Sequence, residues 1–133
     1  MTVSVFVAGR PVPQGSKRHV GNGVLVESAK GLAAWREAIA WQARAAAQKA
    51  GHRSDYAGPV VLDVRFTVPA PQRLSAASPI RRPDIDKLAR AVLDALTGVW
   101  YVDDSQVVSL CAHKAYATAS FAPGACISMS VAP

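Results

Sequence analysis

Cysteine and histidine are scarce in this sequence, and their spacing fits no metal-binding or redox motif. There are 2 cysteines and 3 histidines, and neither Cys111 nor Cys126 belongs to a CxxC pair. Because zinc sites and dithiol redox sites require closely spaced ligands of these types, we expect neither. Both cysteines fall in strand-like segments, so we interpret them as small buried thiols, with one disulfide between them as the alternative.

Long hydrophobic stretches are also missing. No segment approaches the roughly 20 consecutive apolar residues that a membrane-spanning helix needs. The first residues alternate in polarity, whereas a secretory leader has a basic segment followed by an apolar one. We therefore expect a soluble cytoplasmic protein without a membrane partner.

Acidic residues are outnumbered by basic ones. The chain has 9 Asp and Glu against 15 Lys and Arg, for a net charge of +6. This balance favours polyanionic partners, nucleic acid ahead of an anionic membrane surface, although a basic surface that serves only solubility would have the same composition. A length of 133 residues fits one domain spanning 1–133. The chain shows no glycine-rich phosphate-binding motif, and we expect no small-molecule cofactor.

Hydrophobic periodicity predicts an α+β fold in two layers. Alternating residues predict main strands over 1–9, 60–68, 106–116 and 125–131, and a short hairpin with its tip at 21–23. Helices are predicted from Ser28 to Ala50 and from Asp84 to Thr97, each followed by a glycine that can end it. We expect one mixed sheet of about four main strands with two helices packed on it. The strands at 60–68 and 106–116 are expected to be parallel, and the last two strands to pair antiparallel.

Acidic residues gather at both ends of the second predicted helix. Asp84 and Asp86 lie at its start, directly after Arg81-Arg82-Pro83, and Asp103-Asp104 follows its end. Helix capping by Asp84 and a favourable interaction of Asp86 with the helix dipole are the ordinary structural interpretations. The alternative is that the strand after Asp104 returns past the start of the helix, so that these carboxylates meet.

A cluster of carboxylates within a basic surface is the expected form of a site that binds divalent metal and phosphate together. Carboxylate oxygens suit Mg²⁺ or Mn²⁺, and such an ion activates water and neutralises phosphoryl charge during phosphodiester hydrolysis. Aspartates packed together repel one another without a cation. The acidic residues therefore favour a metal-dependent phosphodiesterase over a purely structural role.

Helix geometry limits how these residues can cooperate. Positions two apart in a helix point to nearly opposite sides, so Asp84 can share a metal with Asp86 only from the cap position, which Pro83 favours. Arg90 lies one turn after Asp86 on the same face. It could form a surface ion pair with Asp86 or reach a scissile phosphate, and the sequence leaves both open.

Several segments together resemble a known family. They are Arg-Pro-Asp-Ile-Asp-Lys-Leu at 82–88, Leu-Asp-Ala-Leu-Thr-Gly at 93–98 and Asp-Asp-Ser-Gln-Val-Val at 103–108. These segments resemble the RusA-type Holliday-junction resolvases of bacteria and phages, and Pro-Gln-Gly-Ser-Lys-Arg at 13–18 and Lys114 also match. The resemblance covers nearly the whole chain.

The resemblance implies a homodimeric, Mg²⁺- or Mn²⁺-dependent endodeoxyribonuclease. Such an enzyme resolves four-way DNA junctions by paired symmetric nicks during recombination and repair, in the cytoplasm of a bacterium or a phage-infected cell. The family's metal-binding and catalytic carboxylates fall on Asp84, Asp86 and Asp104, and its catalytic lysine falls on Arg90. Arginine keeps the positive charge but does not readily give up a proton, and Lys87 is the alternative cation for this role.

Phosphate contact is the predicted role of the cations near these segments, and solvated loops are the alternative. The candidates for DNA binding are Lys17, Arg18, Arg81, Arg82, Lys87 and Lys114, with Arg10 in a neighbouring loop. Lys114 shares a strand face with apolar residues, so it must lie near the strand end, extend to solvent or enter a polar site.

Two further functions fit the same residues. A non-catalytic basic DNA-binding module shares the charge but does not account for the clustered aspartates. A structure-specific nuclease acting on flaps or forks shares the chemistry, and the sequence does not separate it from a junction resolvase.

Overall fold

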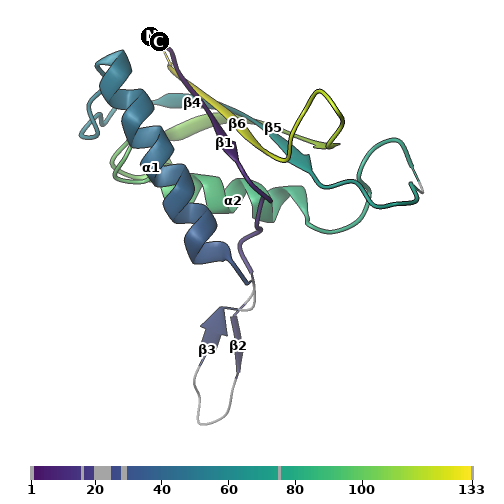
Figure 1. Ribbon diagram of the computed structural model, residues 1–133. Helices are drawn as coiled ribbons and strands as arrows, with labels where there is room; N and C mark the ends of the chain where they lie inside the picture. The colour runs from purple at the N-terminus through teal and green to yellow at the C-terminus, as the bar shows by residue number, and fades with distance from the viewer. Residues whose placement is uncertain (1, 16, 20–24, 28–29, 75, 133) are drawn as a thin grey trace.

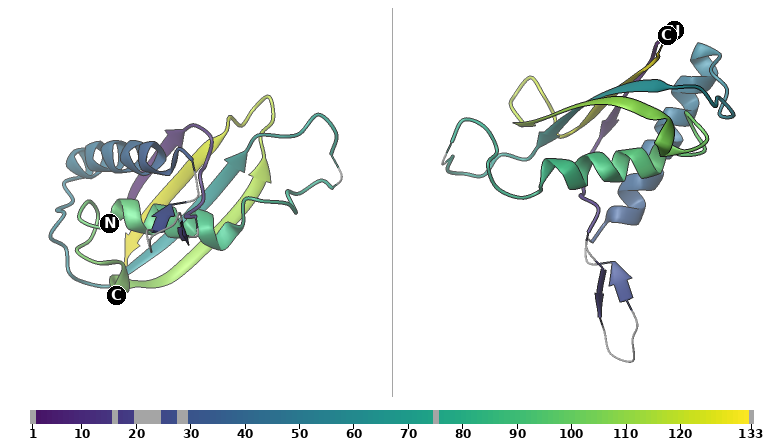
Figure 2. Two further views of the ribbon diagram at one scale, coloured as in Figure 1. Left: turned by 90° about the horizontal axis from the view of Figure 1, so that it is seen from below. Right: turned by 180° about the vertical axis from the view of Figure 1, so that it is seen from behind.

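The computed structural model describes residues 2–15, 17–19, 25–27, 30–74 and 76–132 and has an α+β fold. One mixed sheet contains β1 (Thr2–Ala8), β4 (Val60–Val68), β5 (Val107–Tyr116) and β6 (Gly124–Val131). Helices α1 (Leu32–Ala50) and α2 (Ile85–Leu96) lie together on one face of this sheet (Figures 1 and 2). The expected fold class is confirmed.

A separate hairpin extends away from the body of the molecule (Figure 1). It consists of β2 (Lys17–His19) and β3 (Leu25–Glu27), which pair antiparallel. The predicted tip at 21–23 lies outside the described residues. The hairpin's existence is confirmed, although its strands, predicted around 18–20 and 24–26, are each displaced by one residue.

The strand order in the sheet is β1-β6-β4-β5. β4 and β5 are parallel, as expected, but the expectation that the last two strands pair with each other is wrong. β6 instead pairs antiparallel with both β1 and β4. Its alternate residues Ala125, Ile127 and Met129 are fully buried, which suits a central strand. β5 is consequently left at the edge of the sheet.

The parallel pair places the start of α2 beside the ends of two strands. The chain leaves the carboxyl end of β4, passes through α2 and enters β5 at the other end of the sheet. The Ala117 backbone N–H, just after β5, donates to the Val68 carbonyl at 2.8 Å, which ties the two strand ends together. The start of α2 and the ends of β4 and β5 therefore share one end of the molecule (Figure 2).

The helix boundaries differ slightly from those predicted. α1 begins after Gly31, which has a positive φ of 78°, and Ser28, its predicted cap, lies outside the described residues. Gly51 ends α1 as expected, with a φ of 72°. Ile85 shares the apolar spacing of the buried residues of α2, but it is exposed because it occupies the first position of that helix. Neither helix of the described chain is long and apolar enough to cross a membrane.

Both cysteines are free and exposed, so their interpretation as buried thiols is wrong. Cys111 is paired in register with Asp63, and Cys126 with Arg65. These positions belong to the face of the sheet opposite the helices, because the intervening residues Val64 and Phe66 of β4 point into the core. Strand periodicity identified which residues alternate between the two faces of the sheet, but not which of these faces the helices cover.

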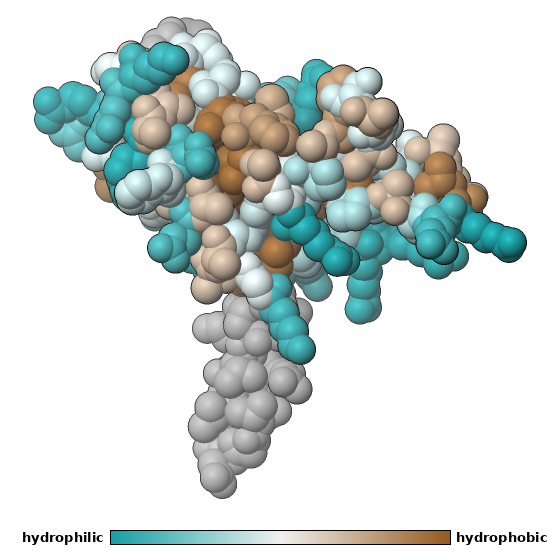
Figure 3. Space-filling view, in the orientation of Figure 1, coloured by the Kyte–Doolittle hydropathy of each residue, from teal (hydrophilic) through white to brown (hydrophobic). Residues whose placement is uncertain are grey.

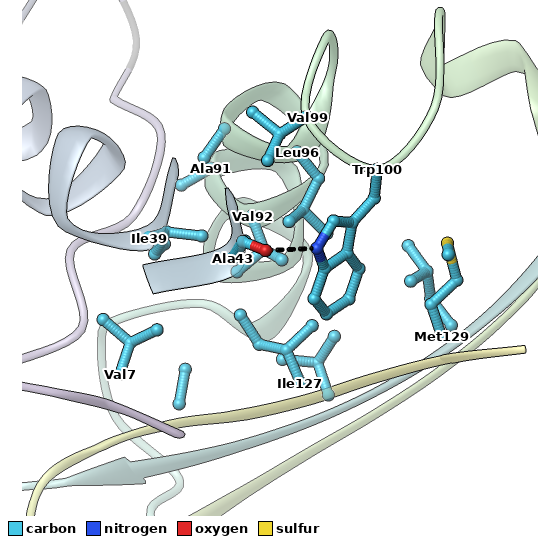
Figure 4. Packing of buried hydrophobic residues seen from close by; sticks show 14 of the residues in the cluster. Val7, Ile39, Ala43, Ala91, Val92, Leu96, Val99, Trp100, Ile127 and Met129 are labelled. Carbon is cyan, nitrogen blue, oxygen red and sulfur yellow. Dashed lines mark hydrogen bonds between the residues drawn. The ribbon is translucent and has the colours of Figure 1, made fainter. Parts of the chain in front are cut away.

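Trp100 joins the two helices to the sheet in the centre of the core (Figure 4). Its indole Nε1 donates a hydrogen bond of 2.8 Å to the Ala43 carbonyl of α1. Its own carbonyl accepts one of 2.7 Å from Nε2 of His52, in the loop after α1. The segment that follows α2 is thereby attached to α1 through polar contacts that are shielded from water.

We predict that Trp100→Ala lowers the free energy of unfolding by about 3–5 kcal/mol, because it leaves a cavity and removes the hydrogen bond to Ala43. Trp41→Ala removes the same side chain from a position that is 71% exposed, and should change the free energy by no more than about 0.5 kcal/mol. Urea unfolding followed by circular dichroism measures both. Equal losses in the two variants would contradict the central role of Trp100.

Candidate active site

Two unpaired carboxylates lie at the start of α2. Asp84 is the N-cap residue, with an extended backbone (φ −72°, ψ 138°), but its side chain makes no capping hydrogen bond. Asp86 lies in the first turn, and both residues are exposed. Among the described residues, the ion pairs are Arg53–Asp55 and Arg65–Asp63, and neither Asp84 nor Asp86 takes part in one. The capping interpretation therefore fails for the Asp84 side chain, and both carboxylates are available to bind a ligand.

Lys114 positions the backbone that leads into Asp84. Its Nζ donates hydrogen bonds to the carbonyls of Arg81, at 3.0 Å, and Pro83, at 2.9 Å. Lys114 lies near the end of β5 and is partly buried, so of the alternatives that the sequence left open, the strand-end position and the polar site both apply. An ammonium group has three donors, so one N–H is left for another acceptor. The predicted contact of Lys114 with DNA stays a prediction.

The loop after β1 packs against the first turn of α2. The Gln14 backbone N–H donates to the Lys87 carbonyl at 2.9 Å. At the start of the same loop, the Gly9 backbone N–H donates to the Pro123 carbonyl at 3.1 Å. The sequence did not reveal this docking, because a backbone hydrogen bond between distant loops leaves no residue signature. Lys17 and Arg18 follow in β2, and their side chains lie outside the described residues.

Asp104 lies at the opposite end of α2. The Tyr101 hydroxyl donates to the Leu93 carbonyl at 2.9 Å, which holds this tyrosine under the last turns of the helix. The pKa of Tyr101 is raised by burial and then by the nearby negative charges of Asp104 and Asp94. α2 has 12 residues, which corresponds to about 18 Å at the usual helical rise. Asp104 is thus separated from Asp84 by roughly the length of the helix.

The three predicted metal ligands consequently do not meet within one chain. Across residues 2–15, 17–19, 25–27, 30–74 and 76–132, no group of three or more His, Cys, Asp or Glu side chains could hold a metal ion. The expectation that the return of the strand after Asp104 makes this residue meet Asp84 and Asp86 at the start of the helix is wrong for a single chain. β5 does return there, but the residue that it brings is Lys114.

Asp103 and Asp104 have different surroundings. The Asp103 carboxylate accepts a hydrogen bond of 3.0 Å from the Ser105 backbone N–H. The Ser105 hydroxyl and then this backbone N–H lower the pKa of Asp103. Gln106 completes the turn by accepting from the Asp103 N–H and donating to the carbonyls of Tyr56 and Gly58. Asp104 begins the short 3₁₀ helix η1 (Asp104–Gln106) and is exposed. The turn is therefore anchored by Asp103 and Gln106, and it presents Asp104 to solvent.

Unneutralised cations surround the acidic pair. Arg81, Arg82, Lys87 and Arg90 are all exposed. The surface ion pair between Asp86 and Arg90, one of the two possibilities that the sequence left open, is not formed. Within the described residues, none of these four cations takes part in an ion pair. Their charges remain available to a polyanion, so the end of the molecule at the start of α2 combines free carboxylates with free cations.

The donor set fits a divalent cation by its chemistry. Asp84, Asp86 and Asp104 offer hard, exposed carboxylate oxygens of the kind that Mg²⁺ and Mn²⁺ prefer. Asp84 and Asp86 provide such oxygens at one end of α2, and Asp104 provides them at the other. A site with all three residues needs ligands from more than one chain.

Comparison with known proteins assigns the family. The family model described as "Endodeoxyribonuclease RusA" matches residues 8–127. An uncharacterized protein of Bacillus subtilis (strain 168), YqaN, is 37% identical over 71 residues, which cover 44% of this chain and 50% of that protein. The match thus spans about half the length of this relative. Because the family model extends over most of the chain, the protein belongs to the RusA endodeoxyribonuclease family.

Proposed function

We propose that this protein is a Mg²⁺- or Mn²⁺-dependent endodeoxyribonuclease that resolves four-way DNA junctions by paired symmetric nicks. It would act in recombination and repair, in the cytoplasm of a bacterium or a phage-infected cell. The observation that carries the proposal is the pair of free carboxylates among free cations at the start of α2, in a chain of a nuclease family.

Different side chains have different roles in the proposed reaction. A divalent ion bound by Asp84, Asp86 and Asp104 would supply an activated water and neutralise phosphoryl charge. Arg90 stabilises negative charge on the scissile phosphate without donating a proton, and Lys87 is the alternative cation for this role. Lys114 holds the backbone ahead of Asp84. Phosphate contacts by Arg81, Arg82, Lys17 and Arg18 orient the DNA.

A second copy of the chain is needed to complete this site, because Asp104 lies at the far end of α2. β5 offers a surface for that copy, since it is an edge strand with unpaired backbone groups. Large apolar side chains are exposed along it and beside it, namely Val108 (63%), Val102 (53%), Leu110 (43%) and Ile85 (37%). Exposed apolar side chains beside an edge strand are compatible with a protein interface.

Antiparallel pairing of two β5 strands about a two-fold axis would join the separated ligands. β5 begins next to Asp104 and ends next to the Lys114–Pro83 contact. In a symmetric antiparallel pair, the start of one strand faces the end of the other. The partner subunit's Asp104 would thereby approach Asp84 and Asp86. The same symmetry creates a second, equivalent site, which suits two equivalent phosphates in a four-way junction.

We predict that Asp86→Asn lowers the rate of junction cleavage by more than about a hundredfold, because even residues that only support metal ligands affect activity by 10–100-fold. Junction affinity should persist, since it depends on the cations. Gel assays of cleavage and binding with four-way, forked and linear DNA, with and without Mg²⁺, measure both. Asp55→Asn, at an exposed ion pair with Arg53, is the matched control and should cleave normally.

The same assay separates the alternatives. Absence of cleavage by the wild-type protein on every DNA, with Mg²⁺ present, would favour a non-catalytic DNA-binding module. Preferential cleavage of forks or flaps would identify a structure-specific nuclease of another kind. Loss of binding together with cleavage in the folded Asp86→Asn variant would contradict the proposed division between carboxylates and cations.

Mixing two inactive variants tests the shared site. In a heterodimer of Asp86→Asn with Asp104→Asn, a shared arrangement leaves one site intact, whereas a site within one chain would leave none. With random exchange of subunits, about a quarter of the wild-type sites should be restored. These sites should yield single nicks rather than paired ones on a plasmid with a four-way junction. A mixture as inactive as its components would exclude the shared site.

Replacement of Lys114 distinguishes positioning from DNA contact. Lys114→Met removes both hydrogen bonds to the Arg81 and Pro83 carbonyls, and we expect kcat to fall about tenfold with a change in DNA affinity of less than about twofold. Lys114→Arg, which keeps a charged donor, should retain more activity. Single-turnover cleavage and a salt titration of binding measure the two effects. Weaker binding with a shallower salt dependence, at unchanged kcat, would instead identify a phosphate contact.

A further inference from the structure

A pocket with a volume of about 400 Å³ opens at the carboxyl ends of β4 and β5. One wall comes from Arg10 in the segment after β1, and another from the loop 69–83, which includes Arg73. Val68 and Tyr116, the last residues of the two strands, form part of the lining. Crevices at the carboxyl ends of parallel strands are common places for ligands, and pockets for small ligands begin at about 300 Å³.

The charge of this pocket selects an anion. Arg10, Arg73, Arg81 and Arg82 line it, and no carboxylate side chain does. None of the four belongs to either of the ion pairs that occur in the described part of the chain. Guanidinium groups bind phosphate through paired N–H donors, so a phosphate group would be the favoured charged component of the ligand.

The remaining lining is apolar, which a phosphate alone would not require. Val68, Tyr116 and several prolines, including Pro83, contribute to it. In Figure 3 the end of the molecule formed by the loop 69–83 likewise carries hydrophobic residues beside strongly hydrophilic ones. Nucleobases stack on aromatic side chains and pack against apolar surfaces once they leave the duplex. The lining thus fits a nucleotide, because a nucleotide has both a polar and an apolar part.

The pocket also adjoins the acidic pair. Pro83 lines the pocket, its carbonyl accepts a hydrogen bond from Lys114, and the next residue is Asp84. A nucleotide in the pocket and a phosphate at the carboxylates would therefore be neighbours on one DNA strand. A base held here could determine which phosphate of that strand is presented for cleavage.

We propose that this pocket binds one unpaired nucleotide of the DNA substrate, with its base against Tyr116 and its phosphate on the arginines. The proposal rests on the proposed function in taking DNA as the ligand, but it assigns a site separate from the carboxylates. Fully paired DNA cannot fill the pocket without extrusion of a base, which requires that base to be unpaired and unstacked. The pocket therefore favours branch points, where interrupted stacking makes a base easier to unpair than within a linear duplex.

Photo-crosslinking in the absence of divalent metal tests the pocket independently of cleavage. Four-way junctions would carry 5-iododeoxyuridine at successive positions around the branch point, and the crosslinked peptide would be identified by mass spectrometry. We expect a crosslink at Tyr116 from one of these positions and none from a linear duplex. Tyr116→Phe should keep the crosslink, whereas Tyr116→Leu should lose it and lower junction affinity about tenfold.

A matched pair of arginine variants tests the anionic part. Arg73→Ala should lower junction affinity about five- to tenfold and reduce the slope of the salt dependence by about one. Arg44→Ala removes the same charge from an exposed position of α1, outside the pocket, and should leave both quantities nearly unchanged. Fluorescence anisotropy with labelled junctions at several salt concentrations provides both values.

The two proposals can fail separately. A crosslink only at other residues, an equal crosslink from linear duplex, or equal effects of Arg73→Ala and Arg44→Ala would overturn the nucleotide pocket. Cleavage of junctions with Mg²⁺ would still support the nuclease in that case. Conversely, a metal-free crosslink at Tyr116 without cleavage of any DNA would support the pocket while removing the nuclease assignment.

Discussion

The parallel pairing of β4 with β5 determines where the charged groups of this protein lie. A parallel pair requires the chain to cross from the end of one strand to the start of the next, and α2 makes that crossing. Asp84 and Asp86 therefore lie at the carboxyl ends of the two strands, and Asp104 lies at the opposite end of the helix. The same crossing brings Lys114 and Tyr116, at the end of β5, to the acidic pair and the pocket.

The elements were predictable because their signals are local. Alternation over 60–68 and the apolar stripe of α2 each depend on a few consecutive residues, and they identified the strands, the helices and the parallel pair. The neighbours of β6 were not predictable, since both partners lie far away in sequence. The exposure of Cys111 and Cys126 escaped prediction for a related reason, because alternation does not say which face of a sheet the helices cover.

The individual residues of the candidate site were predictable from the sequence, but their positions relative to one another were not. The sequence identified Asp84 and Asp86 at the start of a helix, and the structure adds that the Asp84 side chain makes no cap. Strand parity predicted that Lys114 shares a face with apolar residues, but not that it binds two carbonyls ahead of Asp84. The separation of Asp104 from the acidic pair follows from helix length, while the function proposed for this residue requires a second chain, which no single-chain pattern encodes.

A site divided between two chains has an electrostatic consequence. Three carboxylates held together in one folded chain would repel one another whenever no cation is bound, and that repulsion would oppose folding. When the carboxylates are divided between two chains, the same repulsion opposes only the association of the subunits. A bound cation turns this repulsion between the carboxylates into a net attraction. Metal binding and dimer formation would then strengthen each other by linkage. Cleavage would be confined to assemblies in which both copies are present, so that both nicking sites are completed together on one junction.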